Sequence, residues 1–213
     1  MAKTEIEALI AKARGPLALD EATIALLSDS ANLEAIEQLE GALHGFKQLI
    51  GRQFIDRLRR ELAEAAARQG GNWQLVETSR VETYIGLKPA GEMQLFAEDF
   101  WLVFAYSTSP GLPFAAPWLG LFTTPRAQAA IKRELYDRTR AAFRNPKRDS
   151  PADWWVQWDW VPDWPDTTRP RNLALLVGES QARLAVAVAN WLETQAPIVA
   201  DILRRESGVG WNG

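Results

Sequence analysis

The chain has 213 residues, of which 47% are hydrophobic and 24% are charged, and this ordinary globular usage excludes a disordered chain. It contains no cysteine and one histidine, His44, which excludes disulfides, thiolate zinc sites, iron–sulfur clusters and cysteine nucleophiles. Its net charge of −3 gives no overall basic field that would draw it to nucleic acid. We expect neither a bound metal nor a cofactor.

The first residues, Met1 to Glu5, lack the charged-then-apolar profile of a secretory signal. No uninterrupted apolar run approaches the roughly 20 residues that a membrane span needs. We therefore expect a cytoplasmic protein with no membrane partner.

Helical patterns dominate the first third of the chain. Residues 4–28 read as two short helices separated by a Gly-Pro break, and residues 31–69 carry apolar side chains at spacings of three, four or seven. Gly70-Gly71 ends this long amphipathic helix. We expect a helical appendage over residues 1–30, one domain over 31–206 and a short tail over 207–213.

The middle of the chain changes to strand patterns. Four short segments rich in β-branched and aromatic residues are separated by turns that contain proline and glycine. Phe100–Phe104 is apolar on both faces and is expected to be the central strand of an antiparallel meander. The predicted strands are Trp73–Ser79, Val81–Leu87, Phe100–Ser107 and Trp118–Thr123.

The last third predicts a helix from Thr124-Pro125 to about Arg144, with the threonine hydroxyl as its cap. An extended segment, Trp154–Val161, would place Trp154, Val156, Trp158 and Trp160 on one face. A short strand is predicted at Leu173–Val177. A closing helix from about Ser180 is predicted to be kinked or restarted at Pro197. The order of elements predicts an α+β fold with a mostly antiparallel sheet of four to six strands, an inserted helix and a C-terminal helix.

Several short hydrophobic motifs follow this layout. They are Trp73, Tyr84-Ile85-Gly86-Leu87, Phe100–Phe104, Trp118-Leu119-Gly120-Leu121 and Trp154-Trp155. In these motifs the chain, over about residues 31–206, resembles the non-catalytic C-terminal region of bacterial and phage proteins of the PD-(D/E)XK nuclease superfamily. The resemblance implies an association with restriction or phage-defence systems without implying cleavage, because the nuclease core that normally precedes this region has no counterpart here.

The nearest approach to a nuclease motif is Asp163 followed by Glu179 and Gln181. A metal-dependent nuclease of this class holds Mg²⁺ with an Asp and a Glu on adjacent strands, beside a third polar residue that is usually lysine. Glutamine stands in the lysine position here, and Glu179 is also where the first turn of a helix favours an acid. A loop aspartate and a first-turn glutamate are therefore the favoured interpretation, with a divergent Mg²⁺-dependent nuclease as the alternative.

Basic residues are concentrated around the predicted middle helix. Acidic residues are interleaved with them, as on any solvated helix face, so an accessory nucleic-acid-binding surface is an alternative and not the favoured interpretation. The residues concerned are Lys132, Arg133, Arg140, Arg144, Lys147 and Arg148.

Tryptophan is the outlier of the composition, with ten residues against three tyrosines. Trp73, Trp101, Trp118 and Trp191 lie in apolar contexts and are expected in the core.

The tract 154–164 holds five more tryptophans between polar segments, and tryptophan is enriched at interaction hot spots. Two readings stay open for this tract, a pocket-forming core and an exposed aromatic surface. On the second we expect a non-enzymatic module that binds another protein, in a bacterial or phage defence or counter-defence setting. The candidate partner-binding residues are Trp154, Trp155, Trp158, Trp160 and Trp164.

Overall fold

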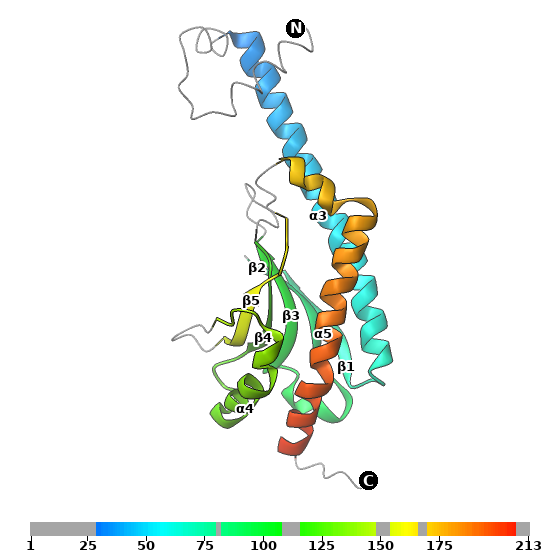
Figure 1. Ribbon diagram of the computed structural model, residues 1–213, viewed down its shortest axis with the longest axis vertical. Coiled ribbons are helices and arrows are strands. Elements are labelled where there is room, and N and C mark those ends of the chain that lie inside the picture. The colour runs from blue at the N-terminus through cyan, green and yellow to red at the C-terminus, as the bar shows by residue number, and fades with distance from the viewer. Residues whose placement is uncertain (1–28, 80–81, 108–115, 148–153, 166–169, 208–213) are drawn as a thin grey trace. The chain divides into compact units, whose positions relative to one another are not determined.

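The computed structural model describes residues 29–79, 82–107, 116–147, 154–165 and 170–207. The chain divides into two compact units, Met1–Gly45 and Phe46–Gly213, and each is considered by itself. The predicted helices over 4–28 lie outside the described residues, and the predicted domain boundary near residue 30 stays a prediction. The elements along the chain are α3 (Ser30–Arg68), β1 (Trp73–Ser79), β2 (Glu82–Pro89), η1 (Gly91–Phe96), β3 (Phe100–Ser107), β4 (Trp118–Thr123), α4 (Ala129–Thr139), η2 (Arg140–Ala142), β5 (Trp155–Trp160), η3 (Pro170–Leu176) and α5 (Gly178–Glu206) (Figure 1).

The described part of the first unit is the beginning of α3. The carboxylate of Asp29 accepts a hydrogen bond of 2.9 Å from the backbone N–H of Ala31, which satisfies one of the free donors at the helix start. Leu33 and Leu39 are exposed here. Within the described ranges, none of the helices combines the length and apolar character needed to cross a membrane.

The second unit is built on one antiparallel sheet in which the strands lie in the order β1-β2-β3-β4-β5. This confirms the α+β class and the predicted meander, with β3 at its centre. The register places Gly86 of β2 opposite Val103 of β3, and Val103 opposite Gly120 of β4. Each connection between neighbouring strands is an antiparallel return, as the turn signals between the predicted strands indicate.

One face of the sheet, here called the inner face, carries the main hydrophobic core. The part of α3 from Phe46 onward and α5 pack on it, and Phe54 of α3 contacts Phe104 of β3 with ring centroids 5.6 Å apart. Most of the large, fully buried side chains of this core alternate along the strands or recur along the helices. They include Leu58, Leu62, Ile85, Leu87, Leu102 and Leu121.

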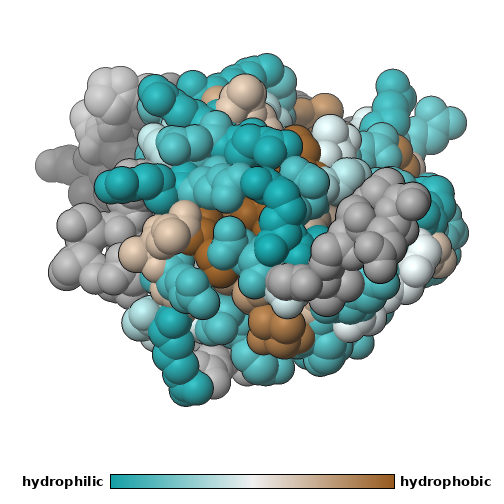
Figure 2. All heavy atoms as spheres, turned by 90° about the horizontal axis from the view of Figure 1, so that it is seen from below, coloured by the Kyte–Doolittle hydropathy of each residue, from teal (hydrophilic) through white to brown (hydrophobic). Residues whose placement is uncertain are grey.

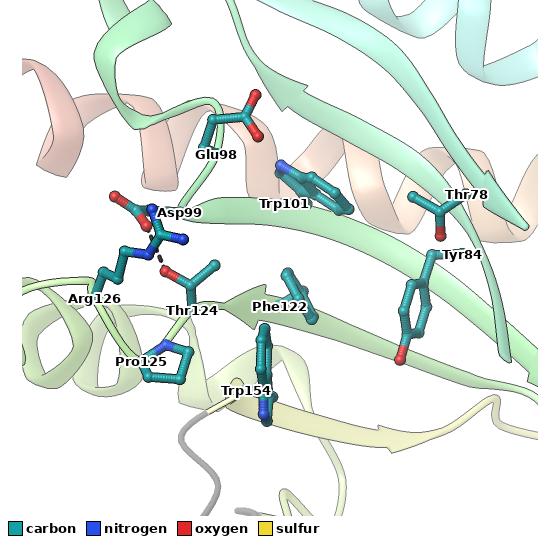
Figure 3. Close-up of a pocket in the computed structure, with 10 residues that line it drawn as sticks. All are labelled: Thr78, Tyr84, Glu98, Asp99, Trp101, Phe122, Thr124, Pro125, Arg126 and Trp154. Atoms are coloured by element: carbon teal, nitrogen blue, oxygen red, sulfur yellow. Dashed lines mark hydrogen bonds between the residues drawn. The ribbon is translucent and has the colours of Figure 1, made fainter. Parts of the chain in front are cut away.

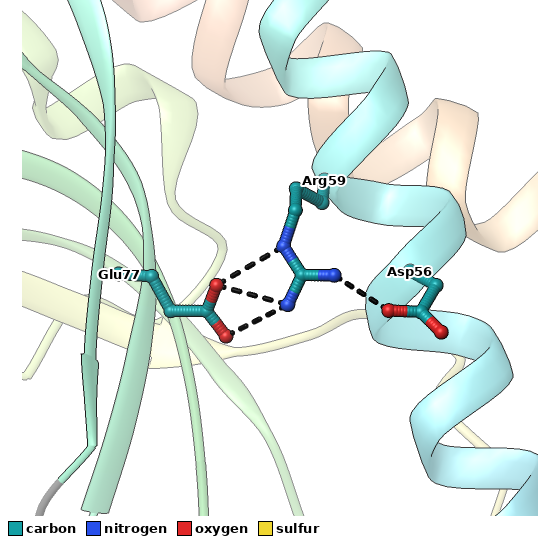
Figure 4. Close-up of polar contacts among 3 residues, drawn as sticks. All are labelled: Asp56, Arg59 and Glu77. Atoms are coloured by element: carbon teal, nitrogen blue, oxygen red, sulfur yellow. Dashed lines mark hydrogen bonds and ion pairs between the residues drawn. The ribbon is translucent and has the colours of Figure 1, made fainter.

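Polar contacts fix both helices in place. Arg59 of α3 donates from Nε and Nη2 to both carboxylate oxygens of Glu77 on β1, at 2.9–3.1 Å, and pairs with Asp56 at 2.5 Å (Figure 4). The hydrogen bonds to Glu77 raise the pKa of the Arg59 guanidinium above its usual value. Arg68 of α3 pairs with Glu193 of α5 at 2.7 Å. These bridges hold α3 against the sheet edge on one side and against α5 on the other.

Three of the predicted elements differ from the structure. The helix expected from Thr124 begins only at Ala129 and is followed by the short η2, because the Thr124 hydroxyl donates to Asp99 and does not cap a helix. The predicted strand Leu173–Val177 is wrong, since this segment lies largely in the helical η3. Pro197 neither ends nor restarts α5, which runs as one helix of 29 residues.

Candidate functional site

The opposite, outer face of the sheet carries a layer of aromatic side chains. Its buried centre is formed by Val103, Ala105, Phe122 and Trp155, all of them strand residues. Around this centre lie four half-buried rings, and two exposed tryptophans extend the layer. We call these aromatic residues the aromatic face: Tyr84, Trp101, Trp118, Phe122, Trp154, Trp155, Trp158 and Trp160.

A β-bulge brings the tryptophans of β5 to this face. The register between β4 and β5 shifts between Leu121 and Phe122, so that Phe122 pairs with Trp155 while Gly120 pairs with Trp158. Val156 consequently turns to the inner core. The predicted alternation of Trp154, Val156, Trp158 and Trp160 on one face is therefore wrong for Val156.

Two glycines lie where the sheet leaves no space for a Cβ, and one of them, Gly120, makes room for these rings. A Cβ on Gly120 would lie 2.7 Å from the Trp155 ring and 2.8 Å from Trp158 Cβ. The Trp155 ring reaches across this space and meets Phe122 and Tyr84 edge-on, at centroid distances of 5.7 and 5.9 Å. At Gly86 the backbone of β3 is closer still, since an added Cβ would lie 1.9 Å from the Leu102 carbonyl oxygen. The aromatic face is thus fitted to a sheet surface without side chains at these two points.

A pocket of about 350 Å³ opens at one end of the aromatic face. Its apolar wall consists of Tyr84, Trp101, Phe122 and Trp154. Figure 3 shows the charged and polar side chains gathered at one end of the pocket, and Tyr84 and Thr78 at the other. The residues at the polar end are Glu98, Asp99, Thr124 and Arg126.

The rings in the pocket wall are stacked in a column. Trp101 and Phe122 have centroids 5.2 Å apart with their planes inclined by 29°, and Phe122 and Trp154 follow at 5.8 Å and 30°. The indole N–H of Trp101 donates to the carbonyl of Ala97, which fixes the orientation of this ring. Trp154 is 44% exposed and therefore offers its ring to a ligand.

The polar end combines two carboxylates with one guanidinium. Asp99 accepts a hydrogen bond from the Thr124 hydroxyl, while Glu98 is 84% exposed at its side chain and lies 4.0 Å from Lys88 Nζ. In the part of the chain that the structure describes, Arg126 forms no ion pair. The Thr78 hydroxyl oxygen at the far end is buried and has no hydrogen-bond partner among the described residues. The pocket thus offers stacking surface and charge, but no assembled acid–base pair.

A second cluster lies at the other end of the aromatic face. Trp118, Trp158 and Trp160 have centroids 5.1–6.1 Å apart, and Lys147 Nζ lies 4.9 Å from the Trp158 centroid and 4.7 Å from that of Trp160. Asp159 holds the segment in place, because its carboxylate accepts the backbone N–H of Asn145 at 2.7 Å. The lysine is therefore part of this cluster as a cation over aromatic rings.

The structure separates the five tryptophans predicted to bind a partner. Trp154 and Trp160 are exposed, at 44% and 42%, and Trp158 is half-buried beside them. Trp155 is buried in the aromatic face. Trp164 lies on the opposite side of the sheet, where its ring meets Phe54 at 5.2 Å in the inner core.

The residues of the alternative nuclease motif lie in a turn and in the first turn of α5. Asp163 is exposed in a turn with φ of 57°, and its carboxylate lies 3.8 Å from Arg144. Glu179 is exposed in the first turn of α5, and Gln181 is buried, donating to the carbonyls of Ile50 and Leu176. The strand that should have joined the two acids is helical. Among the described residues there is no group of three or more His, Cys, Asp or Glu placed to hold a metal ion.

The basic residues proposed for nucleic-acid binding are dispersed over several elements. Lys132 and Arg133 lie on α4 and Arg140 lies in η2, while Arg144 pairs with Asp163. Lys147 covers two tryptophan rings, and Arg148 lies outside the described residues. Figure 2 shows one face of the molecule, on which hydrophilic side chains predominate and hydrophobic ones are visible in small separate patches.

Sequence reasoning missed the polar end of the pocket and the position of two tryptophans on the outer face. Asp99 and Arg126 lie in turns with no motif of their own. Trp101 and Trp118 were expected in the core, yet they are half-buried on the outer face, whereas Trp73 is buried as expected. The outer face could have been predicted from β4, because every second residue of Trp118-Leu119-Gly120-Leu121-Phe122 is aromatic or glycine.

No protein-family model matches the chain, and neither a curated protein nor a solved structure shows significant similarity to it. We therefore base the proposed function on the aromatic face and its pocket.

Proposed function

We propose that the chain is a non-enzymatic interaction module that binds another protein through the aromatic face. The observation that carries this proposal is the exposure of Trp154 and Trp160 on a rigid strand platform whose central rings are buried. Large, rigid aromatic side chains contribute much contact area for little loss of conformational entropy, and they dominate interaction hot spots.

The location of the two exposed tryptophans supports a partner over a purely structural role. Each extends a buried cluster: Trp154 stacks on Phe122, and Trp160 meets Trp118 and Trp158 edge-on. Within the described ranges α3 and α5 pack on the inner face, and an antiparallel sheet covered on one face can leave its other face to solvent or to a partner. By the resemblance noted above, we propose that the partner belongs to a bacterial or phage defence or counter-defence system.

The test is co-purification of the partner with the full chain and with substituted chains. The double variant Trp154→Ala/Trp160→Ala should lose the partner that the unsubstituted chain retains, while its circular dichroism spectrum and thermal midpoint stay close to those of the parent. Leu95→Ala is the matched control, because Leu95 is 63% exposed but lies in η1, away from the aromatic face. Equal capture by the double variant would refute the proposal.

A further inference from the structure

The pocket at the end of the aromatic face has the size and chemistry of a site for one side chain. Ligand pockets in proteins range from about 300 to 1,000 Å³, and this pocket, at about 350 Å³, is at the small end. We infer that it binds an arginine side chain of the partner protein. This inference rests on the proposed function and names the partner chemistry of the same surface.

Charge complementarity favours a cation. The pocket lining contains two carboxylates, Glu98 and Asp99, against one guanidinium, Arg126, and Lys88 lies 4.0 Å from Glu98, so Asp99 is the carboxylate that a cation would meet. Asp99 is the better placed acid, because it is partly buried and its hydrogen bond from Thr124 orients its carboxylate at the pocket end. A charge-assisted hydrogen bond at a partly desolvated carboxylate is stronger than one between neutral groups.

The aromatic column favours arginine over lysine. Phe122 is buried between Trp101 and Trp154, so the exposed face of Trp154 is the one on which a planar guanidinium can stack while its edge pairs with a carboxylate. An ammonium group is a compact, strongly hydrated charge that cannot combine flat stacking with a two-point contact. Pro125 and the methyl group of Thr124 lie between Asp99 and Trp154 and would receive the methylene groups of the arginine stem (Figure 3).

The charge of Arg126 distinguishes a cationic ligand from an anionic one. It lies in the same pocket end, is exposed, and forms no ion pair within the described ranges, so its charge opposes an incoming cation. For a cationic ligand, removal of this charge strengthens binding. For an anion such as a glutamate side chain or a phosphate, the same removal weakens binding. The sign of the effect therefore identifies the class of ligand.

The first experiment titrates the isotope-labelled full chain with capped Gly-Arg-Gly peptide, and follows the indole N–H signals by NMR. Matched peptides carry lysine, citrulline or glutamate in place of arginine. The arginine peptide should shift the Trp154 and Trp101 signals with a dissociation constant in the millimolar range, and citrulline, which has the same shape without the charge, should bind about tenfold more weakly. Equal binding of the citrulline peptide, tighter binding of the glutamate peptide, or no shift with arginine overturns the inference.

The second experiment uses variants with the same arginine peptide. Asp99→Asn should weaken binding about tenfold, and Arg126→Gln should strengthen it several-fold. Asp137→Asn is the control, because it removes the same charge from an exposed position of α4 that does not line the pocket. A weakening by Arg126→Gln, or a loss in Asp137→Asn as large as that in Asp99→Asn, contradicts a charge-based arginine site.

The two proposals fail in different ways. If partner capture depends on Trp154 and Trp160 but is unchanged in Asp99→Asn, the interaction module stands and the arginine site is wrong. If neither set of variants changes capture, the aromatic face itself is not the interface.

Discussion

Trp155 lies over Gly120 so closely that a single methyl group at position 120 would overlap its ring, with Cζ3 at 2.7 Å from the added Cβ. The same ring closes the buried centre of the aromatic face through edge contacts to Phe122 and Tyr84. Position 120 therefore decides whether the aromatic layer can rest on the sheet. The glycine at this position is required by packing, since the Trp155 ring, Trp158 Cβ and the Gln157 carbonyl oxygen would all lie within 3 Å of an added Cβ.

Substitution of the two sheet glycines should be destabilising. We expect Gly120→Ala to lower the free energy of unfolding by about 2 kcal/mol, because the Trp155 ring or the Trp158 backbone must move. Gly86→Ala should cost about 3 kcal/mol or more, since its Cβ meets the backbone of Leu102, which cannot move aside. Urea unfolding followed by fluorescence measures both.

Gly45→Ala is the matched control for these variants. Gly45 lies in α3 with no atom within 4 Å of an added Cβ, so alanine there should stabilise the helix by about 1 kcal/mol. If the sheet variants were as stable as the parent, the close approach of Trp155 and Gly120 would be contradicted.

The two candidate tryptophans on opposite faces should respond differently to truncation. Trp164→Ala removes a ring from the inner core beside Phe54 and Phe104, and should destabilise the protein by about 3–5 kcal/mol. Trp160→Ala removes a ring that is 42% exposed and should cost no more than about 1 kcal/mol. Thermal unfolding of the two variants under identical conditions checks the order, and similar losses would contradict the division of the tract between the faces.

The ion pair between Arg68 and Glu193 should make stability depend on acid pH. The hydrogen bond from Arg68 lowers the pKa of Glu193 below its ordinary value of 4.5 in the folded protein. The unfolded chain therefore binds more protons between these two pKa values, and this contribution to stability is complete above pH 4.5 and is lost as the pH falls through the folded pKa. Urea midpoints measured from pH 7 down to pH 3 should fall less steeply for Glu193→Gln than for the parent, and parallel curves would contradict the pair.

Tyr106 should produce the opposite dependence at alkaline pH. Burial raises the pKa of its phenol above 10.0, so the folded protein keeps a proton that the unfolded chain loses. Stability from this group is complete below pH 10 and is lost as the pH rises through the folded pKa. Tyr106→Phe should abolish this part of the alkaline loss, as measured by unfolding between pH 8 and pH 11, at the cost of the hydrogen bond with Thr83.

The sheet was predictable because its patterns are local. Three of the four strands predicted before the tryptophan tract have the observed limits, and the doubly apolar Phe100–Phe104 lies at the centre of the sheet as expected. In each case the alternation of side chains and the turn residues indicate the same limits. The long helix α3 was predictable for the same reason, since its apolar spacing and the two glycines after it agree.

The candidate site was only half predictable. The density of tryptophans over 154–164 indicated the region, but the bulge that sends Val156 inward and Trp155 outward depends on the pairing with β4. The polar end of the pocket depends on contacts between residues distant in the chain, because Asp99 and Thr124 are brought together by the pairing of β3 with β4. The failed helix start at Thr124 has the same origin, as a tertiary hydrogen bond takes the hydroxyl that would have capped it.

The order of the elements also has a consequence for biosynthesis. The five strands are neighbours in sequence as well as in space, so the sheet can assemble while the ribosome is still adding residues. The helix that completes the inner face, α5, follows the sheet in the chain, and Gln181 at its start bonds to the carbonyl of Ile50 across 131 residues. Until α5 has emerged, the nascent chain exposes the part of the inner face that α3 does not cover, and such exposed apolar surface is prone to aggregation.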